Sequence, residues 1–211
     1  MTQHRVKWRR QRRGFLPLYM DLIHASNPQT LLEWGCTGGT SHSEWQNMGM
    51  TVTGFDVLDY PELTVVKEHS REKFRRKCEQ TFEYDLDLHW GWNSNSADTV
   101  ERFPGPWDII IDDGDVDATI ETSIETFLRW QPTVNGFYFS ETLDGNGVDQ
   151  WFAVSREQHI ANYQVAAQHG FWVYDMAKYS YSDEPESTFI GVWSPNINDY
   201  AHILEKYERV A

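Results

Sequence analysis

A glycine-rich segment flanked by two acidic residues is the part of the sequence best suited to chemistry. Glu33 ends an apolar run and Asp56 ends a second one, with Gly35, Gly38 and Gly39 between them. Glycines let the chain turn sharply and let a ligand approach the backbone. An acid at the end of the second strand of a nucleotide-binding α/β unit holds ribose hydroxyls. The spacing departs from the G-x-G-x-x-G pattern of dinucleotide sites. A carboxylate at Glu33 would repel a pyrophosphate but suits the cationic amino group of a methionine moiety, so the segment predicts a site for S-adenosylmethionine rather than NAD.

A second group of acids follows the most apolar run of the chain. Asp112, Asp113 and Asp115 come at the end of the run that begins at Trp107, and Glu141 ends a later apolar run. Carboxylates this close repel one another unless a cation or a hydrogen-bond donor neutralises them. A hard divalent ion with oxygen ligands is the simplest solution. These acids therefore predict a metal site, and helix capping or water binding by the same acids is the alternative.

The elements that would position these acids alternate between strand and helix patterns. Strands are predicted at 30–34, 51–56, 80–85, 107–112, 134–140, 171–176 and 188–193. Helices are predicted at 14–26, 40–48, 67–78, 117–130, 148–169 and 198–209. This alternation predicts an α/β fold with a mostly parallel sheet that is covered on both faces. Ligands of such sheets bind beyond the carboxyl ends of the strands, which is where the acids lie.

The segment from Glu33 to Ser41 reads E-x-G-x-x-G-G-T-S, and an acid follows at Asp56. It resembles the cofactor loop of class I S-adenosylmethionine-dependent methyltransferases. Further segments resemble the macrocin-type and cephalosporin-hydroxylase-like subgroup of cation-dependent small-molecule O-methyltransferases: residues 4–8 with Tyr19, 41–45, 107–114 and 136–141. The resemblance implies a single Rossmann-like, doubly wound sheet of about seven strands, with the last strand antiparallel.

The resemblance also implies a set of cofactor residues. Glu33 and Gly35 would meet the methionine end of S-adenosylmethionine, and Asp56 would accept hydrogen bonds from the ribose. Asp85 would end the third strand near the adenine, with Asp87 as an alternative. The predicted set is completed by Gly38, Gly39, Thr40, Ser41 and Asp112.

A set of metal ligands is implied in the same way. The resemblance places Asp113 and Glu141 on ligand positions. Thr142 takes a third position, where relatives carry Asp or Asn. Because a hydroxyl is a poorer ligand, the site would be weaker or completed by Asp115 or water. The predicted metal is Mg²⁺ or another divalent cation.

The general base is the point at which the chain departs from its relatives. They carry His or Lys three residues after the metal Asp, where this chain has Val116. Asp115 or Asp117 can substitute, because a metal-bound hydroxyl has a lowered pKa and needs only a weak base. His42 and His89 are further candidates at the rim of the site, and a structural role for each of them is the alternative, which is more common for a lone histidine. The predicted catalytic residues are therefore Asp113, Asp115 and Asp117.

Charge is distributed unevenly along the 211 residues, whose formal net charge is −14. Residues 1–13 hold six Arg or Lys and no acid, and residues 67–77 hold six more. Such clusters could bind nucleic acid, and solvated helix faces are the alternative. By resemblance, residues 1–28 would form a basic arm and helix that cap the site, and 29–211 would form the methyltransferase domain.

Two other features bear on location. Cys36 and Cys78 are the only cysteines, so no disulfide framework is expected and a cytoplasmic location is predicted. No run approaches the roughly 18 apolar residues of a membrane span. The basic N-terminus also lacks the apolar core of a signal peptide.

The sequence as a whole predicts an S-adenosylmethionine-dependent O-methyltransferase. Its acceptor would be a small hydroxylated molecule, a sugar or glycosylated metabolite, for which Trp90 and Trp92 offer a stacking surface or merely pack. No membrane partner is expected, and a homo-oligomer stays open. The alternatives are a nucleic-acid methyltransferase that uses the basic clusters and a catalytically silent homologue that still binds the cofactor.

Overall fold

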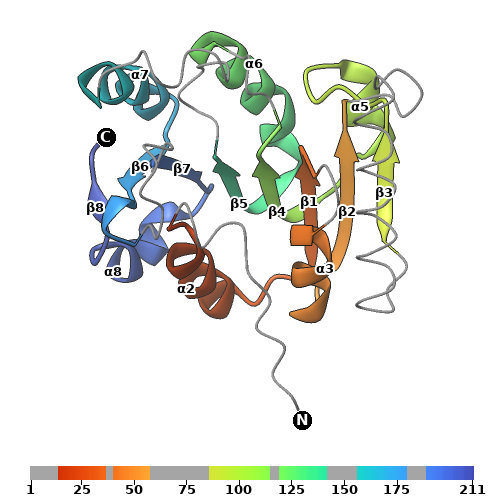
Figure 1. Cartoon of the computed structure of the whole chain (residues 1–211), viewed down its shortest axis with the longest axis horizontal. Coiled ribbons are helices and arrows are strands. Elements are labelled where there is room, and N and C mark those ends of the chain that lie inside the picture. The colour runs from red at the N-terminus through yellow and green to blue at the C-terminus, as the bar shows by residue number, and fades with distance from the viewer. Residues whose placement is uncertain (1–13, 37–39, 58–85, 115–118, 142–155, 180–188) are drawn as a thin grey trace, which may run out of the picture.

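A single mixed sheet forms the centre of the protein (Figure 1). The computed structural model describes residues 14–36, 40–57, 86–114, 119–141, 156–179 and 189–211. Within these ranges the sheet has eight strands in the order β3-β2-β1-β4-β5-β7-β6-β8. Their bounds are Thr30–Trp34 (β1), Thr51–Asp56 (β2), Asp87–Trp90 (β3), Trp107–Asp112 (β4), Val134–Ser140 (β5), Trp172–Asp175 (β6), Phe189–Trp193 (β7) and Glu208–Arg209 (β8). Strands β1 to β5 are parallel, whereas β7 is antiparallel to β5 and β6, and β8 is antiparallel to β6.

Helices cover both faces of the sheet (Figure 1). One face carries α2 (Leu16–Ser26), α3 (Thr40–Asn47) and α8 (Ala201–Leu204), and the other carries α5 (Ala97–Arg102), α6 (Ile120–Trp130) and α7 (Arg156–Gln168). Short 3-10 turns lie at Gln131–Thr133, Ala177–Tyr179 and Ile197–Tyr200. The buried apolar side chains accordingly form two clusters, one on each face of the sheet.

Strand β4 shows why the sheet needs both layers. Ile109 and Ile111 belong to the cluster under α2 and α3, while Ile110 belongs to the cluster under α6. All three are fully buried. A continuous β-branched run is typical of a central parallel strand, because successive side chains point to opposite faces and both faces are covered.

The amino end of β4 is joined to β1 by one carboxylate. Asp108 Oδ2 accepts hydrogen bonds from the backbone N–H groups of Gln29 (2.8 Å) and Thr30 (3.0 Å). In return, Thr30 Oγ1 accepts from the backbone N–H of Asp108 at 3.0 Å. These bonds fix the register of the two central strands, in which Leu31 pairs with Ile109.

The predicted α/β fold class is confirmed, with eight strands in the described residues rather than about seven and with β7 antiparallel. The strands predicted at 30–34, 51–56, 107–112 and 134–140 have the observed bounds. The strands predicted at 171–176 and 188–193 are also present, as β6 and β7, which pair with each other in antiparallel orientation.

One predicted helix needs correction, one predicted strand lies outside the described residues, and one observed helix was not predicted. The strand that pairs with β2 is β3, at 87–90, and the segment predicted for it, 80–85, lies outside the described residues. The helix predicted at 198–209 is instead a 3-10 turn, the short helix α8 and strand β8. Helix α5 was not predicted, because six mostly polar residues carry no visible apolar period.

Residues 1–28 were predicted to form an arm and helix that cap the site, and the structure describes only part of this range. Helix α2 packs into the same core cluster as strands β1, β4 and β5, while residues 1–13 lie outside the described residues. Among the described helices, none is long and apolar enough to cross a membrane.

Candidate functional site at the carboxyl edge of the sheet

Strand register brings the ends of the central strands level with one another. Trp34 at the end of β1 pairs with both Phe55 of β2 and Asp112 of β4. Asp112 in turn pairs with Ser140 at the end of β5. Since these strands are parallel, the acids at or just after their carboxyl ends share one edge of the sheet.

Gly35 makes the turn after β1, and only glycine fits there. Its φ is +74°, and an added Cβ would lie 2.0 Å from the backbone oxygen of Asp113. The Gly35 N–H donates to the Phe55 carbonyl at 3.1 Å, and the Asp113 N–H donates to the Trp34 carbonyl at 3.3 Å. The turn after β1 therefore lies directly against the turn after β4.

Glu33 is held in place before any ligand arrives. Its side chain is 1% exposed, and Oε1 accepts a hydrogen bond of 2.7 Å from Ser41 Oγ. Ser41 lies in the first turn of α3, beyond the glycine-rich segment. This bond therefore links the two ends of the predicted cofactor loop.

The buried thiol of Cys36 lies near several of these acids. Cys36 Sγ donates to the Phe55 carbonyl at 3.0 Å. Burial raises the pKa of the Cys36 thiol well above its ordinary value. Three nearby carboxylates raise this pKa further, those of Glu33, Asp56 and Asp113. The acids at the ends of β1, β2 and β4 thus all lie near this thiol, and Asp56 among them is only 3% exposed.

The Asp112 carboxylate accepts hydrogen bonds from two buried side chains. Its Oδ1 accepts from Trp34 Nε1 at 2.7 Å, and its Oδ2 accepts from the Tyr138 hydroxyl at 2.9 Å. Burial, followed by the charge of Asp112, raises the pKa of Tyr138 well above its ordinary value. Both carboxylate oxygens therefore serve the core under α6, which the prediction of a cofactor role for Asp112 did not anticipate.

The two predicted metal acids leave neighbouring strands. Asp113 is partly exposed and follows β4, while Glu141 is 3% exposed and follows β5. The Glu141 N–H donates to the Asp112 carbonyl at 2.9 Å, which ties the two turns together. Glu141 Oε1 also accepts a 2.7 Å hydrogen bond from the Tyr19 hydroxyl of α2, a contact that the sequence did not predict.

Most of the remaining predicted site residues lie outside the residues that the structure describes. Among the residues that the structure describes, no three His, Cys, Asp or Glu side chains form a group that could hold a metal ion. Thr40 is the first residue of α3. Several predicted positions lie outside the described residues: Gly38, Gly39, Asp85, Asp115, Val116, Asp117, Thr142 and the two basic clusters. The metal and the general base therefore stay predictions.

The two histidines predicted as rim candidates occupy other places. His42 is fully buried and packs on Gly54, where an added Cβ would lie 2.8 Å from the ring Nδ1. Burial lowers the pKa of His42 below its ordinary value, and the nearby Glu33 and Asp87 carboxylates oppose this shift. His42 therefore has the structural role that was the alternative to a place at the rim, because α3 buries it against β2.

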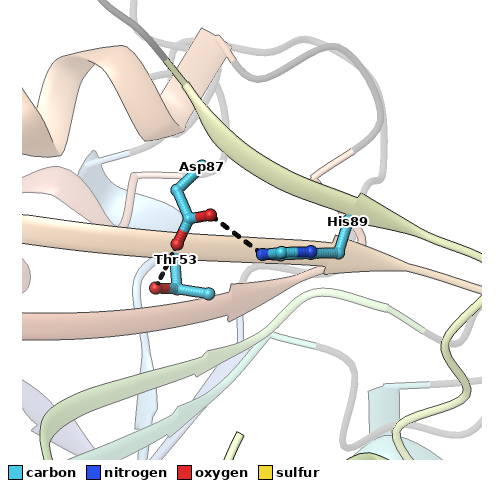
Figure 2. A network of polar contacts seen from close by, with 3 residues as sticks. All are labelled: Thr53, Asp87 and His89. Carbon is cyan, nitrogen blue, oxygen red and sulfur yellow. Dashed lines mark hydrogen bonds and ion pairs between the residues drawn. The ribbon is translucent and has the colours of Figure 1, made fainter. Parts of the chain in front are cut away.

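His89 belongs to a polar network on β2 and β3, shown in Figure 2. Its Nε2 lies 2.9 Å from Asp87 Oδ1, and Thr53 Oγ1 donates to Asp87 Oδ2 at 2.7 Å. Three strand intervals separate β3 from β4, which is about 14 Å at roughly 4.8 Å per interval. His89 is therefore poorly placed to serve as a base beside Asp113.

Trp90 and Trp92, which were predicted either to stack on the acceptor or to pack, lie at and just after the carboxyl end of β3. Trp90 is the last residue of β3. The Trp92 N–H donates to the Asp56 carbonyl at 3.1 Å, and its ring meets Phe103 edge-on at 5.7 Å. Both rings are half-buried. Packing thus accounts for much of their surface, and the backbone at Trp92 helps to hold the end of β2.

Comparison with known proteins supports the fold of this chain. No family model and no curated protein matches the chain. A candidate caffeoyl-CoA O-methyltransferase from Staphylococcus aureus matches at 15% identity and TM-score 0.52, over 84% of this chain and 80% of that one. A protein from Pyrococcus horikoshii OT3 matches at 11% identity and TM-score 0.55, over 91% of this chain and 94% of that one.

A third similar structure is the SAH-bound methyltransferase PaMTH1 from Podospora anserina. It matches at 13% identity and TM-score 0.50, over 85% of this chain and 76% of that one. At such identities the likeness speaks for the fold alone. Together with the strand order, it shows that the chain has the Rossmann-like fold of class I methyltransferases.

Proposed function

We propose that this protein is an S-adenosylmethionine-dependent methyltransferase that methylates a hydroxyl oxygen of a small acceptor, a sugar or glycosylated metabolite. The observation that carries the proposal is the convergence of Glu33, Gly35 and Asp56 at the carboxyl edge of a methyltransferase-like sheet. Ligands of open α/β sheets bind at this edge. A similar fold with SAH bound, in PaMTH1, adds support.

Each of the three residues has a role that follows from its chemistry. The buried Glu33 carboxylate, already fixed by Ser41, would accept hydrogen bonds from the cationic amino group of the methionine end. Gly35 leaves the backbone open to close approach because it lacks a Cβ. Asp56 would accept hydrogen bonds from the ribose hydroxyls. S-adenosylmethionine, when bound, supplies a sulfonium methyl group to an oxygen nucleophile.

Two carboxylates at the ends of β4 and β5 have the chemistry that a divalent cation would need. Asp113 and Glu141 offer carboxylate oxygens, which are the ligands that hard cations prefer, and their turns are joined by a hydrogen bond between the Glu141 N–H and the Asp112 carbonyl. Thr142 and water would complete the set. Such a cation, when bound, lowers the pKa of an acceptor hydroxyl. Asp115 or Asp117 would then take the proton, since Val116 cannot.

Positioning would supply much of the rate. The contact between Gly35 and the backbone of Asp113 holds the turns after β1 and β4 together. An acceptor held beside Asp113 would therefore face a methyl donor held beside Gly35. Fixing two reactants in one geometry removes much of the entropic cost of a bimolecular step.

Calorimetry with purified protein tests the proposal. The protein should bind S-adenosylmethionine or S-adenosylhomocysteine and should not bind NAD. Asp56→Ala should weaken that binding by about 1–3 kcal/mol, because it leaves buried polar groups unpaired. Asp199→Ala, at an exposed acid in the turn Ile197–Tyr200, is the control. Absence of donor binding, or equal binding by the Asp56 variant, would refute the assignment.

A further inference from the structure

We infer that Tyr19 of helix α2 is a positioning residue for the metal site, acting through the carboxylate of Glu141. This inference rests on the proposed function, because it assumes that Glu141 is a metal ligand. The two residues are 122 positions apart in the sequence, yet the Tyr19 hydroxyl donates to Glu141 Oε1 at 2.7 Å inside the protein. Tyr19 therefore brings the N-terminal helix to the end of β5.

The ring of Tyr19 is fixed independently of its hydroxyl. It is fully buried. It meets the ring of Phe139 on β5 edge-on, with centroids 4.6 Å apart, and the ring of Trp45 on α3 at 5.5 Å. Aromatic pairs in this arrangement stabilise the core beyond their buried area. The hydroxyl is thus delivered to Glu141 by packing, and its removal would leave the ring where it is.

A donor in this place has a specific effect on a ligating carboxylate. Groups that hydrogen-bond to metal ligands fix their orientation, and their loss typically lowers metal affinity by 10- to 100-fold. By engaging Oε1, the hydroxyl holds the carboxylate plane of Glu141 in one rotation. It also offsets part of the cost of burying a charge that is only 3% exposed. The inference predicts that the hydroxyl matters most for metal binding.

A purely structural role makes a different prediction. If the bond served only to attach α2 to β5, its loss would lower the unfolding free energy and leave metal affinity unchanged. Tyr174 provides a matched control, because it is a tyrosine at 1% exposure in the same core cluster, on β6. Burial raises its pKa, as expected for a phenol held in the core.

The test is Mn²⁺ binding to the full chain, followed by calorimetry and electron paramagnetic resonance. Tyr19→Phe should weaken Mn²⁺ binding by about 10- to 100-fold, whereas Tyr174→Phe should not change it. Neither variant should alter S-adenosylhomocysteine binding. In a Glu141→Gln background, Tyr19→Phe should have no further effect on Mn²⁺ affinity. Equal Mn²⁺ affinity in Tyr19→Phe and the unmodified protein would overturn the inference.

Two further outcomes keep this inference separate from the proposed function. If the unmodified protein binds S-adenosylhomocysteine but no Mn²⁺, the inference fails and the methyltransferase proposal survives without its metal. If Tyr19→Phe does not fold, fluorotyrosine is placed at position 19 in otherwise unmodified protein. Mn²⁺ should broaden its fluorine NMR signal much more strongly than that of fluorotyrosine at position 174, because β6 lies two strands from β5. An unbroadened signal at position 19 would refute the inference.

Discussion

The carboxyl edge of the sheet has two halves that differ in how their side chains are held. In the cofactor half, at the ends of β1 and β2, Glu33 and Asp56 lie within the strands and are 1% and 3% exposed. In the acceptor half, at the ends of β4 and β5, Asp113 and Glu141 follow the strands. The other predicted residues of that half come later still.

This difference teaches where ordinary sheet geometry is sufficient to build a site. An acid inside a strand is positioned by backbone register, so its place follows from the pairing of β1 with β2 and β4. An acid beyond the strand depends on its turn and on contacts from elsewhere, such as the bond from Tyr19 to Glu141. The cofactor half is thus set by strand pairing, and the acceptor half also depends on contacts from other elements.

The largest effect is expected where the two halves touch. Gly35→Ala would place a Cβ 2.0 Å from the Asp113 carbonyl oxygen at a φ of +74°. The left-handed backbone costs an L-residue about 1–2 kcal/mol, and overpacking costs about 1–3 kcal/mol more. Unfolding in urea should therefore show a loss of roughly 2–5 kcal/mol, together with loss of donor binding.

Gly49→Ala is the control for that substitution. Gly49 has a similar φ of +90°, but no atom lies within 4 Å of its added Cβ. It should therefore lose only the backbone contribution of about 1–2 kcal/mol and keep donor binding. Equal losses at the two glycines would show that the halves are not held together by the close contact at Gly35.

A second prediction separates two adjacent acids. Asp112→Asn replaces one acceptor oxygen with an amide N–H₂ that faces Trp34 Nε1 or the Tyr138 hydroxyl. One buried donor is left without its acceptor, which should lower the unfolding free energy by about 1–3 kcal/mol. Asp113→Asn, at a partly exposed side chain, should stay within about 0.5 kcal/mol. Asp113→Asn should instead abolish turnover and spare donor binding. Equal destabilisation by the two variants would contradict this division of roles.

A third, smaller effect tests whether the cofactor half is arranged in advance. Ser41→Ala removes the donor to Glu33 Oε1 and should weaken S-adenosylhomocysteine binding about twofold to twelvefold, as expected for one hydrogen bond of about 0.5–1.5 kcal/mol. Ser26→Ala, which loses a bond to the Leu22 carbonyl in α2, should bind the product normally. Calorimetry compares the two, and unchanged affinity in Ser41→Ala would show that Glu33 needs no such support.

The smallest effect is a pH dependence within the cofactor half. Burial lowers the pKa of His42, so the folded protein binds this proton less readily than the unfolded chain. Stability from this residue is therefore complete above the unfolded pKa of about 6.5 and is lost as the pH falls below it. His42→Asn should flatten the fall in melting temperature between about pH 7 and pH 5.5. The control His24→Asn, at an exposed position of α2, should not. An unchanged slope in His42→Asn would assign the pH dependence to other groups.

Much of the fold was predictable because its central strands carry their own signals. The run Trp107–Asp112 can be buried on both faces only at the centre of a sheet, and the structure places it there. Strand β8 could not be predicted, because two residues become a strand only by pairing with β6. Strand β3 was not predicted for a similar reason, since Asp87–Trp90 is defined by its pairing with β2.

The candidate site divides along the same line. The acids at the strand ends were predictable from local pattern, and the inward role of Asp112 could have been, because it shares strand parity with Ile110 and faces the same cluster. The contact of Tyr19 with Glu141 could not, because no local pattern connects residues 122 positions apart. The burial of His42 likewise depends on a glycine in another element.

The strand order also determines when each strand can pair while the chain is being synthesised on the ribosome. Strand β1 is made first but pairs with β4, whose residues follow 78 positions later. Until β4 has emerged, β1 and β2 present an unpaired edge, which favours association with other chains. Contacts this distant in sequence also slow folding. Chains interrupted before residue 107 should therefore be aggregation-prone, whereas interruption after β5 leaves the parallel core of the sheet complete.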